Sequence, residues 1–259
     1  MTEIMRYEHV DISYNGTTAV RDINFSLQEG EILGIVGESG SGKSTLLKAA
    51  LGLLGHDGLV TRGDIWYKDK NLPDITEKER RQICGAEIGM IFQMGGSSFC
   101  PIRTIREQIR EMMAAHGQND VEVTEKKTSD ILCKFGFTDP KRILDSYPFE
   151  LSGGMQQRVC VAVAMILQPK ILLADEPTSA LDVTVQRQVV AEMLLARRLY
   201  GTAILLVTHN IGVVRAMADK VLVLYEGEIV EYNRTDAIMS NPQSPYTQKL
   251  LAAVPRLKL

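Results

Sequence analysis

The chain has 259 residues, 45% of them hydrophobic and 24% charged, and its net charge is −3 at pH 7. This length suits one large domain, or one domain with an inserted lobe, and the composition is that of an ordinary folded protein without low-complexity tracts. The small net charge indicates neither a nucleic-acid-binding surface nor an acidic tail.

Cysteine positions and apolar run lengths limit the class further. The four cysteines, at 84, 100, 133 and 160, form no Cys-x-x-Cys pair, so we expect free thiols in a reducing compartment rather than ligands of zinc or an iron–sulfur cluster. The amino terminus has no apolar signal core, and the longest apolar run, Val159 to Leu167, is about half of what a membrane span requires. We therefore expect a cytosolic protein, or one held at a membrane by partners.

The first segments alternate between apolar and polar residues. The apolar positions are Val10, Ile12 and Tyr14, followed by Ile23, Phe25 and Leu27. Because Asn15-Gly16 between them is a typical hairpin turn, the pattern predicts an antiparallel β structure.

Residues 32–36 form a short, nearly continuous apolar strand, and residues 37–45 after it read Gly-Glu-Ser-Gly-Ser-Gly-Lys-Ser-Thr. This fits the phosphate-loop pattern G-x-x-x-x-G-K-[ST], and a helix-like segment follows at 46–51; a plain glycine-rich turn is the alternative. Glycine permits backbone conformations in which successive N–H groups point at a polyphosphate. Lys43 supplies a positive charge for the β and γ phosphates, and Ser44 supplies a hydroxyl for Mg²⁺. Thr45 is placed to reach the α phosphate. The segment predicts a nucleoside triphosphate site.

Residues from about 94 to 147 have polar helical patterns, at 104–116 and 124–135, and no obvious central strand, so they predict an inserted helical lobe. Further apolar runs at 171–174 and 203–207, with a helical segment at 182–200 between them, predict a parallel sheet covered by helices. Near the end, residues 241–245 break the chain before a last short helix at 246–253.

Two carboxylates, Asp175 and Glu176, end the apolar run at 171–174. Ligands of open α/β sheets bind at the carboxyl ends of strands, and this arrangement suits Asp175 to Mg²⁺ and Glu176 to the attacking water. The alternative is a charge pair at a helix start before Pro177.

Residues 151–158, Leu-Ser-Gly-Gly-Met-Gln-Gln-Arg, resemble the signature sequence of ATP-binding cassette (ABC) proteins. An ordinary Ser-Gly helix start is the alternative. In that family the segment contacts the γ phosphate of a nucleotide held by the partner subunit. The resemblance therefore implies ATP sandwiched between two chains.

Four further positions match family elements in the expected order. Gln93 resembles the Q-loop residue, 179–182 the D-loop, His209 the switch histidine and Tyr14 the aromatic residue that stacks on adenine. Taken singly, each has an ordinary alternative as a loop or packing residue. The resemblance implies catalytic roles for Lys43, Gln93, Glu176 and His209, and Mg²⁺ ligation by Ser44, Gln93 and Asp175. It implies ATP contacts from Tyr14, Gly37, Glu38, Ser39, Gly40, Ser41, Gly42, Lys43, Ser44, Thr45, Ser152, Gly153, Gly154, Gln156 and Asp182.

The implied fold is an α/β P-loop NTPase core, with a mixed, largely parallel sheet and helices, an antiparallel β subdomain and an inserted α-helical subdomain. We expect the ATPase core, RecA-like plus antiparallel β, at 1–93 and 151–232. The helical subdomain is expected at 94–150, and a short carboxy-terminal extension at 233–259.

Within the family, the chain looks most like ATPases of oligopeptide, dipeptide and nickel importers. The motifs shared with that branch are 37–44, 147–155, 180–186 and Ser244-Pro245-Tyr246-Thr247. Residues 94–101 depart from the family's usual Asp-Pro and Ser-Leu-Asn-Pro, which puts the partner's identity in question. Peptide-importer relatives often carry a cysteine cluster for an iron–sulfur centre after the Pro-Tyr-Thr element. This chain has no cysteine after Cys160, which favours the shorter nickel-type relatives and leaves peptides open.

The resemblance implies an ATP hydrolase using ATP and Mg²⁺ at the cytoplasmic face of the membrane. The implied partners are a second ATPase subunit, identical or related, two transmembrane permease subunits and, indirectly, an extracytoplasmic binding protein, with no nucleic acid. The alternatives are a soluble ABC ATPase acting on DNA or ribosomes and a non-hydrolysing regulatory subunit. The usual coiled coil, zinc ligands or second cassette of the former do not appear, and Glu176 and His209 argue against the latter.

Overall fold

The structure, a computed structural model, describes residues 2–253. The described residues divide into two compact units. Unit 1 comprises those up to 81, 173–175 and those from 203 on; unit 2 comprises 82–172 and 176–202. These limits differ from the domain boundaries expected from the sequence, which stay a prediction.

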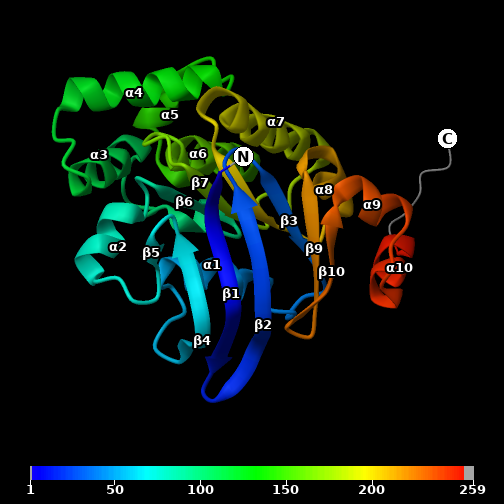
Figure 1. Ribbon diagram of the computed structural model, residues 1–259. Helices are drawn as coiled ribbons and strands as arrows, with labels where there is room; N and C mark the ends of the chain where they lie inside the picture. The colour runs from blue at the N-terminus through cyan, green and yellow to red at the C-terminus, as the bar shows by residue number, and fades with distance from the viewer. Residues whose placement is uncertain (1, 254–259) are drawn as a thin grey trace, which may run out of the picture. The chain divides into compact units, whose positions relative to one another are not determined.

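In unit 1, a four-stranded sheet confirms the predicted amino-terminal hairpin (Figure 1). The order is β2 (Thr17–Gln28), β1 (Glu3–Tyr14), β4 (Gly58–Tyr67) and β5 (Lys70–Asn71), all antiparallel, and Tyr14 pairs with Thr17 across the turn. The buried Tyr7 stacks on Phe25, with ring centroids 4.4 Å apart, and donates its hydroxyl to the Leu46 carbonyl of α1 (Lys43–Leu51) at 2.8 Å. This contact joins the sheet to the helix after the phosphate loop.

The second sheet of unit 1 carries β3 (Ile32–Val36) between two parallel neighbours, β8 (Ala203–Val207) and β9 (Lys220–Tyr225). The edge strand β10 (Glu228–Arg234) is antiparallel to β9, and β7 (Ile171–Asp175) follows β8 in the order. Every residue of β3, β7 and β8 is buried, which confirms the interpretation of the continuous apolar runs. Helices α8 (Ile211–Met217), α9 (Thr235–Ser240) and α10 (Pro245–Ala252) complete the unit.

Unit 2 is mainly helical, with β6 (Ile88–Ile91) as a short strand. Its helices are α3 (Ile105–Ala115), α4 (Val121–Lys134), α5 (Pro140–Asp145), α6 (Gly153–Ala164) and α7 (Val183–Tyr200), with 3₁₀ turns η1 (Gly95–Ser98) and η2 (Pro148–Glu150). A further helix, α2 (Glu77–Ile83), spans the boundary between the units along the chain.

Capping residues set where these helices begin. Thr104 and Glu107 form a capping box at the start of α3, close to the predicted limit. Helix α4 begins earlier than predicted because Asp120 accepts a hydrogen bond from the Val123 N–H. Helix α10 begins at Pro245, one residue earlier than predicted, since proline is well suited to the first turn. Among residues 2–253, no helix has both the length and the apolar character needed to cross a bilayer.

Candidate phosphate-binding site

The loop between β3 and α1 requires glycine at two positions because neighbouring atoms leave no room for a side chain. A Cβ at Gly37 would lie 2.1 Å from the Leu224 carbonyl oxygen. A Cβ at Gly42 would lie 2.3 Å from Cγ1 of Val20, and Gly42 also has φ 100°, in the left-handed region. The backbone of the loop is therefore fixed from behind by β2 and β9.

Helix α1 starts without a side-chain cap, as α9 and α10 do, whereas six of the other described helices have one. Six helices begin with a side chain that accepts a hydrogen bond from a first-turn amide: Thr104, Asp120, Asp139, Ser152, Asp182 and Asn210. Helix α1 begins at Gly42, with no side-chain cap and no acidic residue in its first turn. Its amides and the positive end of its dipole are thus left for an anion.

Lys43 lies at the first position of α1 and is 7% exposed. Its ammonium donates to the carbonyl oxygens of Gly37 at 2.9 Å and Glu38 at 2.6 Å, both in the loop. Lys43 is therefore held against the loop whose amides the sequence assigns to phosphates.

The two predicted Mg²⁺ ligands of unit 1 are in direct contact. Ser44 Oγ donates to Asp175 Oδ1 at 2.7 Å, although 131 residues separate them in sequence, and Asp175 is only 3% exposed. A hydroxyl and a carboxylate are hard oxygen ligands, so the donor set fits Mg²⁺. Gln93, the third predicted ligand, is exposed in unit 2 after β6.

The other predicted residues of unit 1 flank these elements. Tyr14 ends β1, and its ring is so close to Gly58 that a Cβ there would lie 2.7 Å from Tyr14 Cε1. His209 is exposed between β8 and α8, in a turn where the Asn210 N–H donates to Thr208 Oγ1 at 3.0 Å. Three loop residues, Glu38, Ser39 and Gly40, are exposed, whereas Ser41 is 5% exposed.

In unit 2, the predicted signature segment forms the start of α6. Ser152 accepts a hydrogen bond from the Met155 N–H at 3.3 Å, and Gln156 donates to the carbonyls of Pro148 and Leu151. A Cβ at Gly154 would lie 2.9 Å from Val185, whereas a Cβ at Gly153 meets no atom within 4 Å. Gly154 therefore serves packing on α7, and Gly153 leaves the helix start open on that side.

Glu176 and Asp182 have clear local roles in unit 2. Glu176 is 8% exposed and has φ 48°, a conformation that is unfavourable for residues other than glycine. Asp182 accepts hydrogen bonds from the N–H groups of Thr184 and Val185 and so caps α7. A nucleotide contact by Asp182 stays a prediction.

Residues 95 and 96 were not predicted to have a packing role, although the Gly-Gly pair is visible in the sequence. The Gly95 N–H donates to Gln157 Oε1 at 2.9 Å, and the Cys160 thiol contacts the Gly95 carbonyl at 2.9 Å. A Cβ at Gly96 would lie 1.9 Å from Gln156 Oε1. The segment that departs from the family pattern is therefore packed closely on α6.

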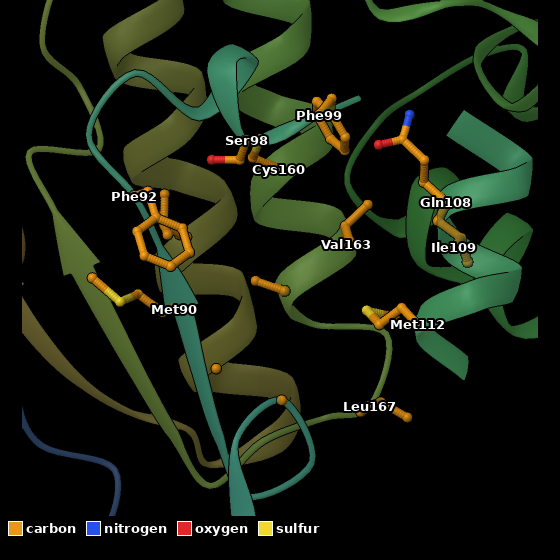
Figure 2. Close-up of a pocket in the computed structure, with 14 residues that line it drawn as sticks. Met90, Phe92, Ser98, Phe99, Gln108, Ile109, Met112, Cys160, Val163 and Leu167 are labelled. Atoms are coloured by element: carbon orange, nitrogen blue, oxygen red, sulfur yellow. The ribbon is translucent and has the colours of Figure 1, made fainter. Parts of the chain in front are cut away.

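Next to this segment lies an apolar pocket of about 300 Å³ (Figure 2). It is lined by β6, the residues around η1, α3 and α6, with Phe92, Phe99, Met112 and Val163 among its side chains. Its lining is mainly apolar and includes Phe92, the residue directly before Gln93.

Comparisons with known proteins agree with this geometry. The family described as "ABC transporter" matches residues 20–179, and that described as "Oligopeptide/dipeptide transporter, C-terminal region" matches 230–259. The oligopeptide transport ATP-binding protein AmiE of Streptococcus pneumoniae is 40% identical over 95% of this chain and 70% of its own length. The dipeptide transport ATP-binding protein DppD of Escherichia coli K12 is 43% identical over 92% of this chain and 72% of its own length.

Solved structures have the same fold. A dimeric ATP-binding cassette, MJ0796, in a post-hydrolysis state bound to ADP and Pi is 28% identical, with a TM-score of 0.78, over 90% of this chain and 99% of that chain. The fold of cbiO1 from Clostridium perfringens matches with a TM-score of 0.81 at 24% identity, over 99% of this chain and 97% of that chain. The predicted fold class is confirmed.

Proposed function

Because this chain belongs to the ABC transporter family and is an ATP hydrolase, we propose that it is the ATP-hydrolysing subunit of an importer of dipeptides or oligopeptides. The observation that carries the choice of cargo is the match of residues 230–259 to the C-terminal region of oligopeptide and dipeptide transporters. The relatives AmiE and DppD are named for the same cargo classes. These names favour peptides over the nickel complexes that the sequence also left open.

The proposed chemistry is in-line attack of water on the γ phosphate of ATP. Ser44 and Asp175 are the residues of unit 1 that would hold Mg²⁺, which when bound neutralises phosphate charge. Lys43 adds a positive charge at the β and γ phosphates, Glu176 orients and polarises the water, and His209 contacts the γ phosphate. Gln93 senses the metal and the water.

The proposed working assembly contains two ATPase subunits. Each ATP is held by residues 37–45 of one subunit and covered by the helix start at 152–156 of the other, with Tyr14 stacked on adenine and Asp182 at the subunit contact. The uncapped start of α1 and the open space at Gly153 support this arrangement, since both leave room for phosphate. The dimeric state of the cassette MJ0796 supports it by analogy.

We propose further that the apolar pocket beside the Gln93 segment receives a cytoplasmic segment of a permease subunit (Figure 2). Its aromatic and methionine side chains suit the apolar face of a helical segment. Methionine side chains are flexible and can adapt to the shape of such a partner. This docking would place the chain at the cytoplasmic face of the membrane.

Cells that lack this chain test the cargo. We expect uptake of a labelled dipeptide or oligopeptide to be lost, to return with the wild-type chain, and to stay absent with Lys43→Ala, which removes the phosphate-binding charge. Uptake of labelled nickel should be unaffected. Loss of nickel uptake with normal peptide uptake would contradict the proposed cargo.

A further inference from the structure

The carboxy-terminal helix α10 contacts the phosphate loop directly. The hydroxyl oxygen of Tyr246, the second residue of α10, accepts a hydrogen bond from the Glu38 N–H at 3.0 Å. Both residues belong to unit 1, and 208 positions separate them in sequence. No local sequence pattern would reveal this contact.

Tyr246 is held by packing as well as by this bond. Its ring lies 4.3 Å from that of Tyr225 at the end of β9, and it packs against a buried cluster that includes Val36, the last residue of β3. Upstream of α10, the Glu231 carboxylate accepts hydrogen bonds from the N–H groups of Gln243 and Ser244 at 2.8 and 3.0 Å. These contacts hold α10 beside β9 and β10, at the edge of the sheet to which β3 belongs (Figure 1).

The Glu38 N–H and the Gly37 carbonyl belong to one peptide unit. The unit is trans and planar, so the two groups point in opposite directions. The N–H donates to Tyr246, and the carbonyl accepts from the Lys43 ammonium at 2.9 Å. The orientation of this peptide therefore links α10 to the lysine of the phosphate loop.

We infer that Tyr246 is a positioning residue for ATP binding, which acts through the Gly37–Glu38 peptide on Lys43. The inference rests on the proposed role of residues 37–45. Without the hydroxyl, this peptide loses a partner that fixes its rotation, and the loop samples orientations in which Lys43 and the amides do not converge on phosphate. The extension thus contributes to nucleotide affinity.

A neutral hydroxyl suits this role. Burial raises the pKa of the Tyr246 phenol; the hydrogen bond from the Glu38 N–H opposes this in part, and the negative charge of Glu38 adds to the increase. The group therefore stays uncharged at neutral pH and adds no negative charge beside the triphosphate.

Tyr246→Phe keeps the ring and removes only the acceptor. We expect the Kd for ATP to rise about fivefold, as for the loss of one hydrogen bond, and the KM for ATP to rise with it while kcat changes little. The Glu38 amide should exchange its hydrogen faster with solvent. The matched control is Tyr232→Phe, which removes a hydroxyl bonded to the Ser26 carbonyl at 3.3 Å, away from the loop, and should leave ATP affinity unchanged.

An ATP affinity of Tyr246→Phe within twofold of wild type would overturn the inference. An equal loss of affinity in Tyr232→Phe would also overturn it, because the effect would then be general. Lys43→Ala separates this failure from failure of the proposed site. If Lys43→Ala binds ATP as tightly as wild type, the assignment of the phosphate loop itself is wrong.

Discussion

Glu176 is the residue on which the proposed hydrolytic step depends most. It is buried and has an unfavourable backbone conformation of the kind that gathers at functional sites. Replacing it with Gln keeps the size and removes the base. We expect phosphate release to fall by about 100-fold or more while ATP binding is retained.

Phosphate release and ATP binding are measured on the same preparation of Glu176→Gln. Glu122→Gln, at an exposed first-turn position of α4 in the same unit, is the matched control and should hydrolyse ATP normally. A normal rate in Glu176→Gln would assign the water-orienting role to another group.

We expect Glu192 on α7 to make the stability of the chain depend on pH. Its carboxylate pairs with Arg158 of α6 at 2.5 Å, both side chains are largely buried, and its Oε2 has no hydrogen-bond partner among the described residues. Burial, opposed in part by Arg158, raises the pKa of Glu192 to about 7. Since the unfolded chain ionises near pH 4.5, the contribution of Glu192 to stability is present below that pH and is lost as the pH rises through 7.

Glu192→Gln should remove this dependence. Relative to the variant, the wild type is expected to lose on the order of 2 to 3 kcal/mol of unfolding free energy between pH 5 and pH 8. Chemical denaturation at the two pH values measures it. A difference between the two proteins that is the same at both pH values would show that Glu192 is ionised throughout.

At the scale of elements, adjacent glycines at the start of α6 offer a matched pair. A Cβ at Gly154 would lie 2.9 Å from two atoms of Val185 near the start of α7, whereas a Cβ at Gly153 meets nothing within 4 Å. We expect Gly154→Ala to lower the unfolding free energy by about 1–3 kcal/mol and Gly153→Ala to leave it nearly unchanged. Adding Val185→Ala to Gly154→Ala should recover part of the loss, and equal stabilities of the two single variants would contradict the packing role.

Elements with strong local patterns were predictable. Residues 32–36, 171–174 and 203–207 are apolar because both faces of those strands are buried, and α7 starts where Asp182 caps it. Strands β4, β9 and β10 were not predicted; β4 and β9 pair with β1 and β3, which lie far away in sequence, and β10 pairs with β9 alone among the described strands.

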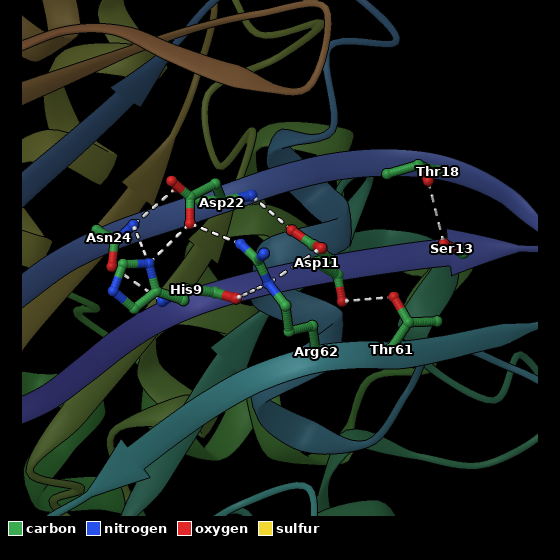
Figure 3. A network of polar contacts seen from close by, with 8 residues as sticks. All are labelled: His9, Asp11, Ser13, Thr18, Asp22, Asn24, Thr61 and Arg62. Carbon is green, nitrogen blue, oxygen red and sulfur yellow. Dashed lines mark hydrogen bonds and ion pairs between the residues drawn. The ribbon is translucent and has the colours of Figure 1, made fainter.

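The irregularities of the first sheet likewise could not be predicted from the local sequence (Figure 3). His9 and Asp22 have φ 50° and 48°, and they face each other across β1 and β2 with Nδ1 and Oδ1 2.8 Å apart. Arg62 of β4 donates to Asp22 at 2.8 Å, and the Asp22 N–H donates to Asp11 at 2.7 Å. Nothing in the local sequence marks these residues as bulges, because the bulge is formed by polar partners on neighbouring strands.

Some parts of the candidate site could be predicted from the sequence, and others could not. The loop at 37–45 could be predicted because its chemistry is contiguous in sequence. The hydrogen bond of Ser44 to Asp175 agrees with the rule that ligand sites form at carboxyl ends of strands, since Asp175 ends β7 and Ser44 follows the loop after β3 in the same sheet. The contact of Tyr246 with Glu38 depends on where α10 packs, and the sequence indicated only that residues 244–247 mark a branch of the family.

For the whole molecule, the decisive question is whether each ATP is shared between two chains. Two variants disable opposite halves of such a site. Lys43→Ala removes the charge of the phosphate loop. Gly153→Glu places a carboxylate at the start of α6, where the fold has room for a side chain and the helix dipole tolerates negative charge, but where it repels a γ phosphate from a partner.

Each variant alone should hydrolyse ATP poorly, because every site in its dimer is defective. In a mixture, however, mixed dimers contain one intact site, made from the loop of the Gly153→Glu chain and the helix start of the Lys43→Ala chain. We expect the mixture to recover at most about a quarter of the wild-type rate, since half of the dimers are mixed and half of their sites are intact.

The size of Glu176→Gln with ATP, measured by light scattering, shows whether identical chains pair at all. If identical chains pair and the mixture recovers no activity, the proposal of a shared site is wrong. If Glu176→Gln stays monomeric alone but pairs with a related ATPase subunit, the site is shared between two different chains. The test is then repeated with one of the two variants in each of those subunits.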